Sequence, residues 1–206
     1  MNSLFTLILS SLRRCKVCII SIFITYCFSC TIGFLMVQSG NDFALSQRDR
    51  IVGTAVHHEK AAINYLSGNK LTAALYDFTG NLFLGAVPQT ALGLSILVPY
   101  FTVLYQGWVG GIVSVDNSHH NRLDKIKTAF YYIIVLLLQL IPYSLSIGAG
   151  VKFGVEVYKQ NMKIGWKFWR FRIRKENLLD IRNIYLISIP LFFIASLFEF
   201  FSSWNI

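Results

Sequence analysis

The sequence predicts an all-α fold: a polytopic bundle of about five transmembrane helices, with a basic amphipathic helix at the membrane interface. Three observations lead to this fold class. Apolar residues make up 54% of the 206-residue chain, and its mean hydropathy is +0.53. Charged residues make up 14%, whereas typical soluble domains carry about 25%, so charge is too scarce to cover a soluble surface. The apolar residues also gather in charge-poor stretches long enough to cross a bilayer, which requires about 20 residues.

The charge-poor stretches divide the chain into a leading segment, an anchor, a loop and a membrane domain. The expected order is a cytoplasmic or interfacial segment at 1–16, a transmembrane anchor at 17–37, an extracytoplasmic loop at 38–70 and a membrane domain at 71–206. Apolar residues recur at helical spacing in the leading segment, which is typical of a short helix on the membrane surface. The anchor is longer than the apolar part of a signal peptide, about 7–15 residues, and lacks a small-residue cleavage site. We therefore expect it to be retained.

The membrane domain is expected to hold four further helices. They cover about 75–96, 99–115, 128–150 and 184–203. The first two lie in an almost charge-free stretch that is too long for one span and is punctuated by Pro88 and Pro99. Two helices joined by a tight apolar turn are one interpretation, and one kinked helix with a re-entrant piece is the other. The last two helices each contain a proline, which membrane helices tolerate when neighbours satisfy the freed carbonyl.

The distribution of charge predicts the orientation. Residues 1–16 carry three positive charges, and residues 151–182 carry nine positive and three negative charges. The segments expected on the opposite side, 38–77 and 116–127, together carry seven positive and six negative charges. Lys and Arg are enriched in cytoplasmic loops. We therefore expect a protein of the bacterial cytoplasmic membrane with its N-terminus inside and its C-terminus outside.

A basic and aromatic pattern marks residues 151–175. Apolar and aromatic side chains recur at intervals of three or four, and basic side chains fall on an adjacent face. The candidate lipid-contacting residues are Lys159, Lys163, Trp166, Lys167, Trp169 and Arg170. This pattern is typical of a helix in the headgroup region of an anionic leaflet, and an extension of the preceding span that packs on protein is the alternative. The net charge of the chain is +9, but we do not expect the protein to bind nucleic acid, because such binding needs a soluble basic face.

Cysteine and histidine pairs stand out but do not predict a metal site. They are Cys15/Cys18, Cys27/Cys30, His57/His58 and His119/His120. Only eight membrane-like residues separate the two C-x-x-C pairs, against about 15–20 in zinc ribbons, and we interpret the histidines as parts of solvated loops. The sequence shows no Ser/His/Asp set, phosphate loop or paired carboxylates. We therefore expect neither an enzyme nor a bound cofactor or metal.

Polar and small residues within the spans form the candidate intramembrane site. They are Asn81, Gln106, Gly107, Gln139 and Glu199. Intramembrane polar groups are costly and tend to face protein or a water-filled path, and small residues permit close helix packing. Glu199 alone among them can ionise; its expected partners are Arg122, Lys125, Lys127 and Lys70. We expect Glu199 to tether the last helix to the bundle, with ion passage as the alternative.

Several short motifs follow one another in the membrane domain. They are Phe78-x-x-Asn81; Leu104-Tyr105-Gln106-Gly107-x-x-Gly110; Ile141-Pro142-Tyr143, followed by Gly148-Ala149-Gly150; and Ile189-Pro190-Leu191, followed by Ala195-Ser196-Leu197-Phe198-Glu199-Phe200. Their order over about residues 71–203 resembles the stage II sporulation protein M family of bacterial membrane proteins. The chain departs from the family's pattern at Gln106, where the family has Asn, and at Tyr143, Ser144 and Ile147, where it has His, Gly and Glu.

The resemblance implies an all-helical bundle with no known catalytic activity. The family's named member is a membrane component of the machinery that remodels the septal wall during engulfment, where it is a partner and anchor for other proteins. We therefore expect a non-enzymatic membrane scaffold that associates with other membrane proteins or with itself. A small transporter or permease subunit is the alternative, because transporters build midplane sites from broken helices and buried amides.

Overall fold

The computed structural model describes residues 4–164 and 173–202, and these residues are helical apart from their turns and loops. The elements are α1 (Leu4–Gln38), α2 (Asp42–His58), α3 (Lys60–Leu66), α4 (Lys70–Thr79), η1 (Gly80–Ala86), α5 (Val87–Leu92), η2 (Gly93–Ser95), α6 (Val98–Ile112), α7 (Ile126–Ile164) and α8 (Lys175–Phe201). No strand occurs within this part of the chain. The all-helical fold class is therefore confirmed.

Three of these helices are long and apolar enough to cross a membrane. They are Leu4–Gln38, Ile126–Met162 and Lys175–Phe201. The stretch between residues 71 and 115 forms two shorter rods instead: a helical run from α4 through η2, and the 15-residue α6. A turn at Ile96 and Leu97 separates them, and Ile96 has a φ of 60°. The expected tight turn is thus present, whereas length and composition alone do not establish five spans.

The helical run from α4 to η2 changes its winding at a proline. The segment η1 is a π-helix, in which the N–H of Val87 reaches back to the carbonyl of Leu82. Pro88 follows directly and has no N–H to donate, so the regular α-helical bond at that position cannot form. Single π turns of this kind are rare and frequently occur at functional sites. Asn81, one of the candidate residues, lies within it.

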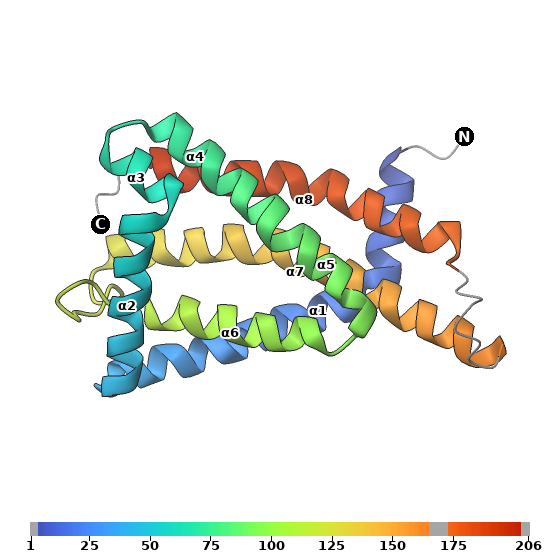
Figure 1. Ribbon diagram of the computed structural model, residues 1–206, viewed down its shortest axis with the longest axis horizontal. Helices are drawn as coiled ribbons and strands as arrows, with labels where there is room; N and C mark the ends of the chain where they lie inside the picture. The colour runs from blue at the N-terminus through green and yellow to red at the C-terminus, as the bar shows by residue number, and fades with distance from the viewer. Residues whose placement is uncertain (1–3, 165–172, 203–206) are drawn as a thin grey trace.

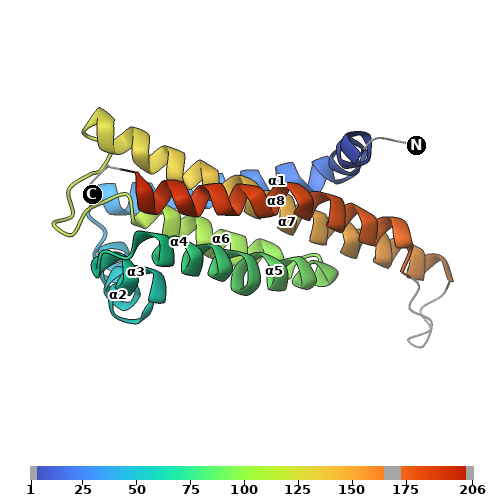
Figure 2. The same cartoon turned by 90° about the horizontal axis from the view of Figure 1, so that it is seen from above.

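The long helices run side by side, and α2 crosses one end of the bundle (Figures 1 and 2). That end also carries α3, the 113–125 loop and the end of α8. The opposite end carries the N-terminal part of α1, the end of α7 and the start of α8 (Figure 1). The segments predicted to share a side of the membrane therefore share an end of the bundle.

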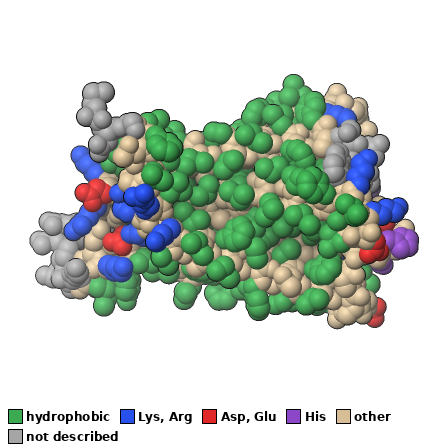
Figure 3. Space-filling model, turned by 180° about the vertical axis from the view of Figure 1, so that it is seen from behind, with side chains coloured by type: hydrophobic (Ala, Val, Ile, Leu, Met, Phe, Trp, Pro, Cys, Tyr) green, Lys and Arg blue, Asp and Glu red, His purple; other side chains and the backbone are tan. Residues whose placement is uncertain are grey.

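An apolar belt separates the two polar ends (Figure 3). Figure 3 shows Lys and Arg side chains gathered at one end with a few acidic ones among them, and His side chains with acidic and basic ones at the other. Large apolar side chains on the belt are widely exposed; examples are Leu84 at 83%, Phe101 at 69% and Phe28 at 63%. Soluble monomers rarely expose so many large apolar side chains together, and a bilayer accounts for them.

The leading segment is part of α1 rather than a separate surface helix. Helix α1 is continuous from Leu4 to Gln38 and bends, so that its first part lies across the bundle (Figure 1). Ser11 is buried and donates a hydrogen bond of 2.8 Å to Asp180 of α8, and Arg14 Nε donates to the same carboxylate at 2.9 Å. Asn183 donates to Ser11 Oγ at 3.0 Å. The expected boundary at residue 17 therefore falls inside a helix that docks on α8.

The start of the basic stretch continues α7. Val151, Phe153 and Val157 are buried against the bundle, and Lys152 pairs with Glu156 at 2.8 Å. Residues 151–164 therefore extend the preceding helix, which was the alternative interpretation for this region. Lys159 lies 3.6 Å from Glu156, whereas the Lys163 side chain and residues Trp166, Lys167, Trp169 and Arg170 lie outside the described part. The interfacial position of this stretch stays a prediction.

Glycines bring α6 and α7 into close contact with α1. A Cβ placed on Gly107 would lie 2.5 Å from the carbonyl oxygen of Tyr26, and one on Gly148 would lie 2.6 Å from Cα of Ile19. Real Cβ atoms do not approach other atoms so closely. Small residues of this kind let membrane helices pack backbone to backbone. Gly107 thus packs within the chain, on α1.

Candidate functional site

The first group of polar side chains joins four elements inside the bundle, namely α4, η1, α7 and α8. Asp77 and Asn81 are four residues apart and therefore share a helix face. Asn81 Nδ2 donates to Asp77 Oδ2 at 2.9 Å, and Ser196 Oγ of α8 donates to the same oxygen at 2.6 Å. Tyr143 of α7 donates from its hydroxyl to Asn81 Oδ1 at 2.9 Å. The helix that carries the π turn is therefore connected to both α7 and α8.

A second contact joins α7 and α8 directly. Gln139 Nε2 donates to Glu199 Oε2 at 2.6 Å, and the hydroxyl of Tyr131 donates to the Glu199 carbonyl at 3.0 Å. The sequence-based expectation had named basic residues as partners of Glu199 and missed this amide. Helices α7 and α8 run in opposite directions (Figure 1), and the hydrogen bond places Gln139 opposite Glu199. Both residues were already candidates, and only their pairing was unexpected.

Three cavities surround these contacts. A cavity of about 310 Å³ is lined by Asn81, Gln106 and Gln139, together with Tyr26, Tyr105 and Tyr143. A second, of about 290 Å³, is lined by Glu59, Asp77 and Glu199 among others. A third, of about 690 Å³, includes Glu59, Asp77 and Asn81 in its walls. The structure thus brings together four of the five candidate intramembrane residues, while Gly107 lies apart from these cavities in the contact with α1.

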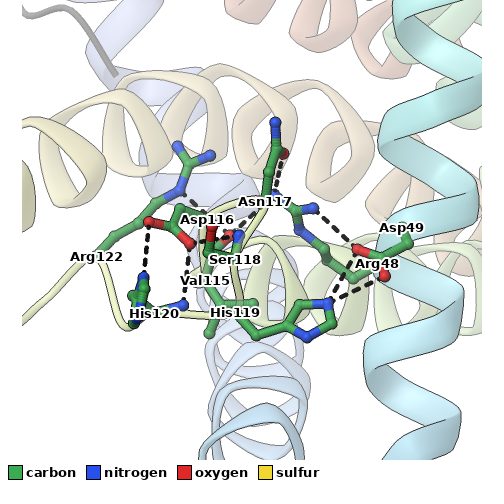
Figure 4. A network of polar contacts seen from close by, with 9 residues as sticks. All are labelled: Arg48, Asp49, Val115, Asp116, Asn117, Ser118, His119, His120 and Arg122. Atoms are coloured by element: carbon green, nitrogen blue, oxygen red, sulfur yellow. Dashed lines mark hydrogen bonds and ion pairs between the residues drawn. The ribbon is translucent and has the colours of Figure 1, made fainter.

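Polar contacts of a different kind hold α2 across the end of the bundle (Figure 4). The Arg48 side chain is 3% exposed. One of its terminal nitrogens donates to the Val115 carbonyl at 3.2 Å and to Asn117 Oδ1 at 2.9 Å, and the other donates to Asp49 at 3.0 Å. The guanidinium of Arg48 and the imidazole of His119, 3.0 Å from Asp49 Oδ2, lower the pKa of the Asp49 carboxyl. His119 is exposed, as expected of a solvated loop, and it also contacts Asp49 of α2.

The 113–125 loop is ordered by its own hydrogen bonds. Asp116 accepts the backbone N–H of His120 at 3.0 Å and that of Ser118 at 2.8 Å, and these bonds lower the pKa of its carboxyl. Arg122 Nε donates to the Val115 carbonyl at 3.3 Å, and burial lowers the pKa of its guanidinium. Asp readily closes turns of this kind by bonding the backbone two residues on. In the sequence, an Asp two residues before Ser118 is the pattern that could have indicated this hydrogen-bonded turn.

The described residues show no metal-binding arrangement. No group of three or more His, Cys, Asp and Glu side chains within 4–164 and 173–202 has the geometry to hold an ion. The four cysteines all lie on α1 as free thiols, and Cys15 packs in a core with Ala149 and Ile184. What the intramembrane groups can do is accept and donate hydrogen bonds inside an apolar bundle.

Comparison with known families agrees with this arrangement. The family model described as SpoIIM, stage II sporulation protein M, matches residues 22–203. No curated protein and no solved structure matches the chain significantly. The matched region begins within α1 and ends just after α8, so it contains Asn81, Gln106, Gln139 and Glu199. It covers most of the chain, which therefore belongs to the stage II sporulation protein M family.

Proposed function

We propose that this protein is a non-enzymatic scaffold of the bacterial cytoplasmic membrane, which docks partners of an envelope-remodelling complex at the end crossed by α2. Family membership supports a membrane protein of the sporulation type. The observation that carries the docking role is the α2 platform, which we define as α2 together with residues 113–125. Arg48 and His119 hold the two parts of this platform together.

The platform is built as a fixed surface rather than a loose loop. Asn41 caps α2 by accepting the N–H of Ala44 at 3.0 Å. Ala44 is fully buried and packs with Val37 and Ile112, at the ends of α1 and α6, and with Val115 of the 113–125 loop. A helix held in this way presents a preformed surface, and pre-organised surfaces lose less conformational freedom when a partner binds. This is the property expected of an anchor for other proteins.

The proposed topology has five crossings. The three long helices are joined by the run of residues 70–95 and by α6, whose 15 residues rise about 22 Å at 1.5 Å per residue. An α6 of that length crosses most of the roughly 30 Å hydrocarbon core. The positive charge at the end that carries the α1 N-terminus and residues 151–164 supports a cytoplasmic position for that end. The α2 platform then lies outside.

A cross-linking experiment tests the docking role. Single cysteines at Arg50 on the exposed face of α2 and at Lys159 at the opposite end would carry the same photoactivatable cross-linker. We expect the Arg50 probe to capture envelope proteins that the Lys159 probe does not capture. If both probes captured the same proteins, the docking platform would be ruled out. It would also be ruled out if the probes captured nothing but a second copy of this chain.

Transport is the second candidate, and the neighbouring cavities favour it. Asp77 lies in the walls of two cavities, one of which it shares with Glu199. Carboxylates within a bundle mark ion or substrate pathways in many transporters. Purified protein in liposomes should then support a solute or cation flux that Asp77→Asn abolishes. A flux equal to that of empty liposomes would exclude transport, and the scaffold role would stand.

A further inference from the structure

The cavity of about 310 Å³ has a composition that the scaffold role does not explain. Its walls come from α1, η1, α6 and α7, and three amides and three phenols face it. The amides are Asn81, Gln106 and Gln139, and the phenols are Tyr26, Tyr105 and Tyr143. Its volume falls at the lower end of the range of ligand pockets, about 300–1,000 Å³. The cavity is large enough for a molecular group and is built for hydrogen bonding.

Three of these polar groups have no hydrogen-bond partner in the protein. Within residues 4–164 and 173–202, the structure gives no hydrogen bond to the Gln106 amide or to the hydroxyls of Tyr26 and Tyr105. Polar groups inside a membrane domain are costly when they are unsatisfied. A molecule in the cavity that offers a hydroxyl or an ester would satisfy them.

The surroundings of the cavity select an uncharged ligand. No Lys, Arg, His, Asp or Glu is among its lining residues in the described part of the chain. Asn81 and Gln139 turn their N–H groups outward, to Asp77 and Glu199 respectively. Two acidic side chains therefore stand behind the walls, and a phosphate would enter without any cation to compensate it. Asn81 Oδ1 already accepts the Tyr143 hydroxyl, so the Gln139 amide oxygen is the one left to accept a proton donor such as a ligand hydroxyl.

The cavity reaches the surface at Tyr105, on a helix that carries exposed apolar side chains. Tyr105 lines the cavity and is 58% exposed, and the exposed Leu84 and Phe101 lie on the adjoining elements η1 and α6. A ligand entering here comes from the bilayer rather than from water. From this geometry we propose that the cavity binds the uncharged head of a membrane lipid, of the diacylglycerol class, whose acyl chains remain against the belt.

Photo-cross-linking of the full chain in nanodiscs tests this proposal. The probe is a diacylglycerol with a diazirine next to its glycerol, compared with phosphatidylglycerol carrying the same diazirine. We expect the neutral probe to label peptides from η1 and α6, and unlabelled diacylglycerol to compete. The cavity-filling variant Val109→Phe should abolish this labelling. Val98→Phe, on the same helix but outside the cavity lining, should label like the wild type.

A second variant keeps the test decisive if Val109→Phe fails to fold. Gln106→Leu retains the side-chain volume but removes the unpartnered amide, and should reduce labelling by about fivefold, the effect of losing one neutral hydrogen bond. Wild-type labelling by Gln106→Leu would overturn the proposal. So would equal labelling of the same peptides by the phosphatidylglycerol probe, or labelling spread evenly over the belt.

Discussion

The amide of Gln139 donates a 2.6 Å hydrogen bond to the carboxylate of Glu199, joining α7 to α8 inside the bundle. The contact is consistent with the predicted role of Glu199 as a tether of the last helix, with an amide rather than a cation as its partner. It also makes the pair testable as a unit, because either partner can be removed alone or together with the other.

Glu199→Leu should destabilise the protein by about 1–3 kcal/mol, because it leaves the Gln139 amide without a partner. Glu199→Gln should be nearly neutral, since an amide oxygen can still accept the bond. The double variant Gln139→Leu with Glu199→Leu should recover part of the loss, because both polar groups are then gone. Thermal unfolding in detergent measures all three. Strict additivity of the two Leu variants would show that the residues are not coupled.

Arg48→Met should loosen the α2 platform. Asn117 Oδ1 would lose its donor, and the Val115 carbonyl would keep only the bond from Arg122, at a cost of about 1–3 kcal/mol for the loss of hydrogen bonds from a charged donor. Hydrogen exchange should therefore accelerate in both α2 and residues 113–125, while α7 and α8 stay protected. Arg50→Met, at an exposed position on the same helix, is the matched control. Unchanged exchange in Arg48→Met would remove this residue from the platform's support.

The platform should also loosen in acid. Arg48 and His119 lower the pKa of Asp49 in the folded state, so the contribution of Asp49 to stability is present above its ordinary pKa of about 3.9. That contribution is lost as the pH falls through the lowered folded pKa. Because Asp49 is half exposed, solvent screening keeps the effect small.

Trp108 reports this change, since its ring lies 6.0 Å from that of Phe43 on α2. In a variant that keeps only this tryptophan, the fluorescence of Trp108 should change as the pH falls below about 5 and through the ordinary pKa of an Asp carboxyl, about 3.9. Asp49→Asn should remove part of this acid transition. An identical transition in Asp49→Asn would assign it to other carboxyls, such as Asp116.

Much of the fold was accessible from the sequence because a bilayer imposes simple rules. The apolar belt, the helices and the turn near residue 97 follow from hydropathy and proline placement, and Asn81 and Gln139 stood out as amides in apolar helices. The charge pattern likewise grouped the segments that share an end of the bundle (Figure 1). These features depend on local composition, which the sequence displays directly.

The pairings depend instead on packing between distant helices. Asp77 was counted with the charges of the preceding loop, yet its helix begins at Lys70 and carries it into contact with Ser196. Arg14 and Asp180 meet although 166 residues separate them. Arg48 gave no sign of burial, because only the position of the 113–125 loop covers it. No local pattern encodes such relationships.

Gly107→Ala should weaken the contact between α1 and α6. Its Cβ would lie 2.5 Å from the Tyr26 carbonyl oxygen, and overpacking of this kind costs about 1–3 kcal/mol. Gly53→Ala on α2 is the control, because no atom lies within 4 Å of its Cβ position. In a helix interior that exchange should instead stabilise by about 0.5–1 kcal/mol. Equal thermal stability of the two variants would show that α1 and α6 can separate freely.

The proposed orientation predicts which positions a membrane-impermeant thiol reagent reaches in intact cells. In a background with all four native cysteines replaced by alanine, a cysteine at Ser118 should be labelled and a cysteine at Lys159 should not. Both positions are exposed and lie at opposite ends of the bundle, so local burial cannot explain a difference. After the cells are opened, both should be labelled, which shows that each variant is folded and reactive.

Labelling of Lys159→Cys but not of Ser118→Cys in intact cells would invert the topology and place the α2 platform in the cytoplasm. The docking partners would then be cytoplasmic, and the charge bias of residues 1–16 and 151–182 would need an explanation other than the positive-inside rule.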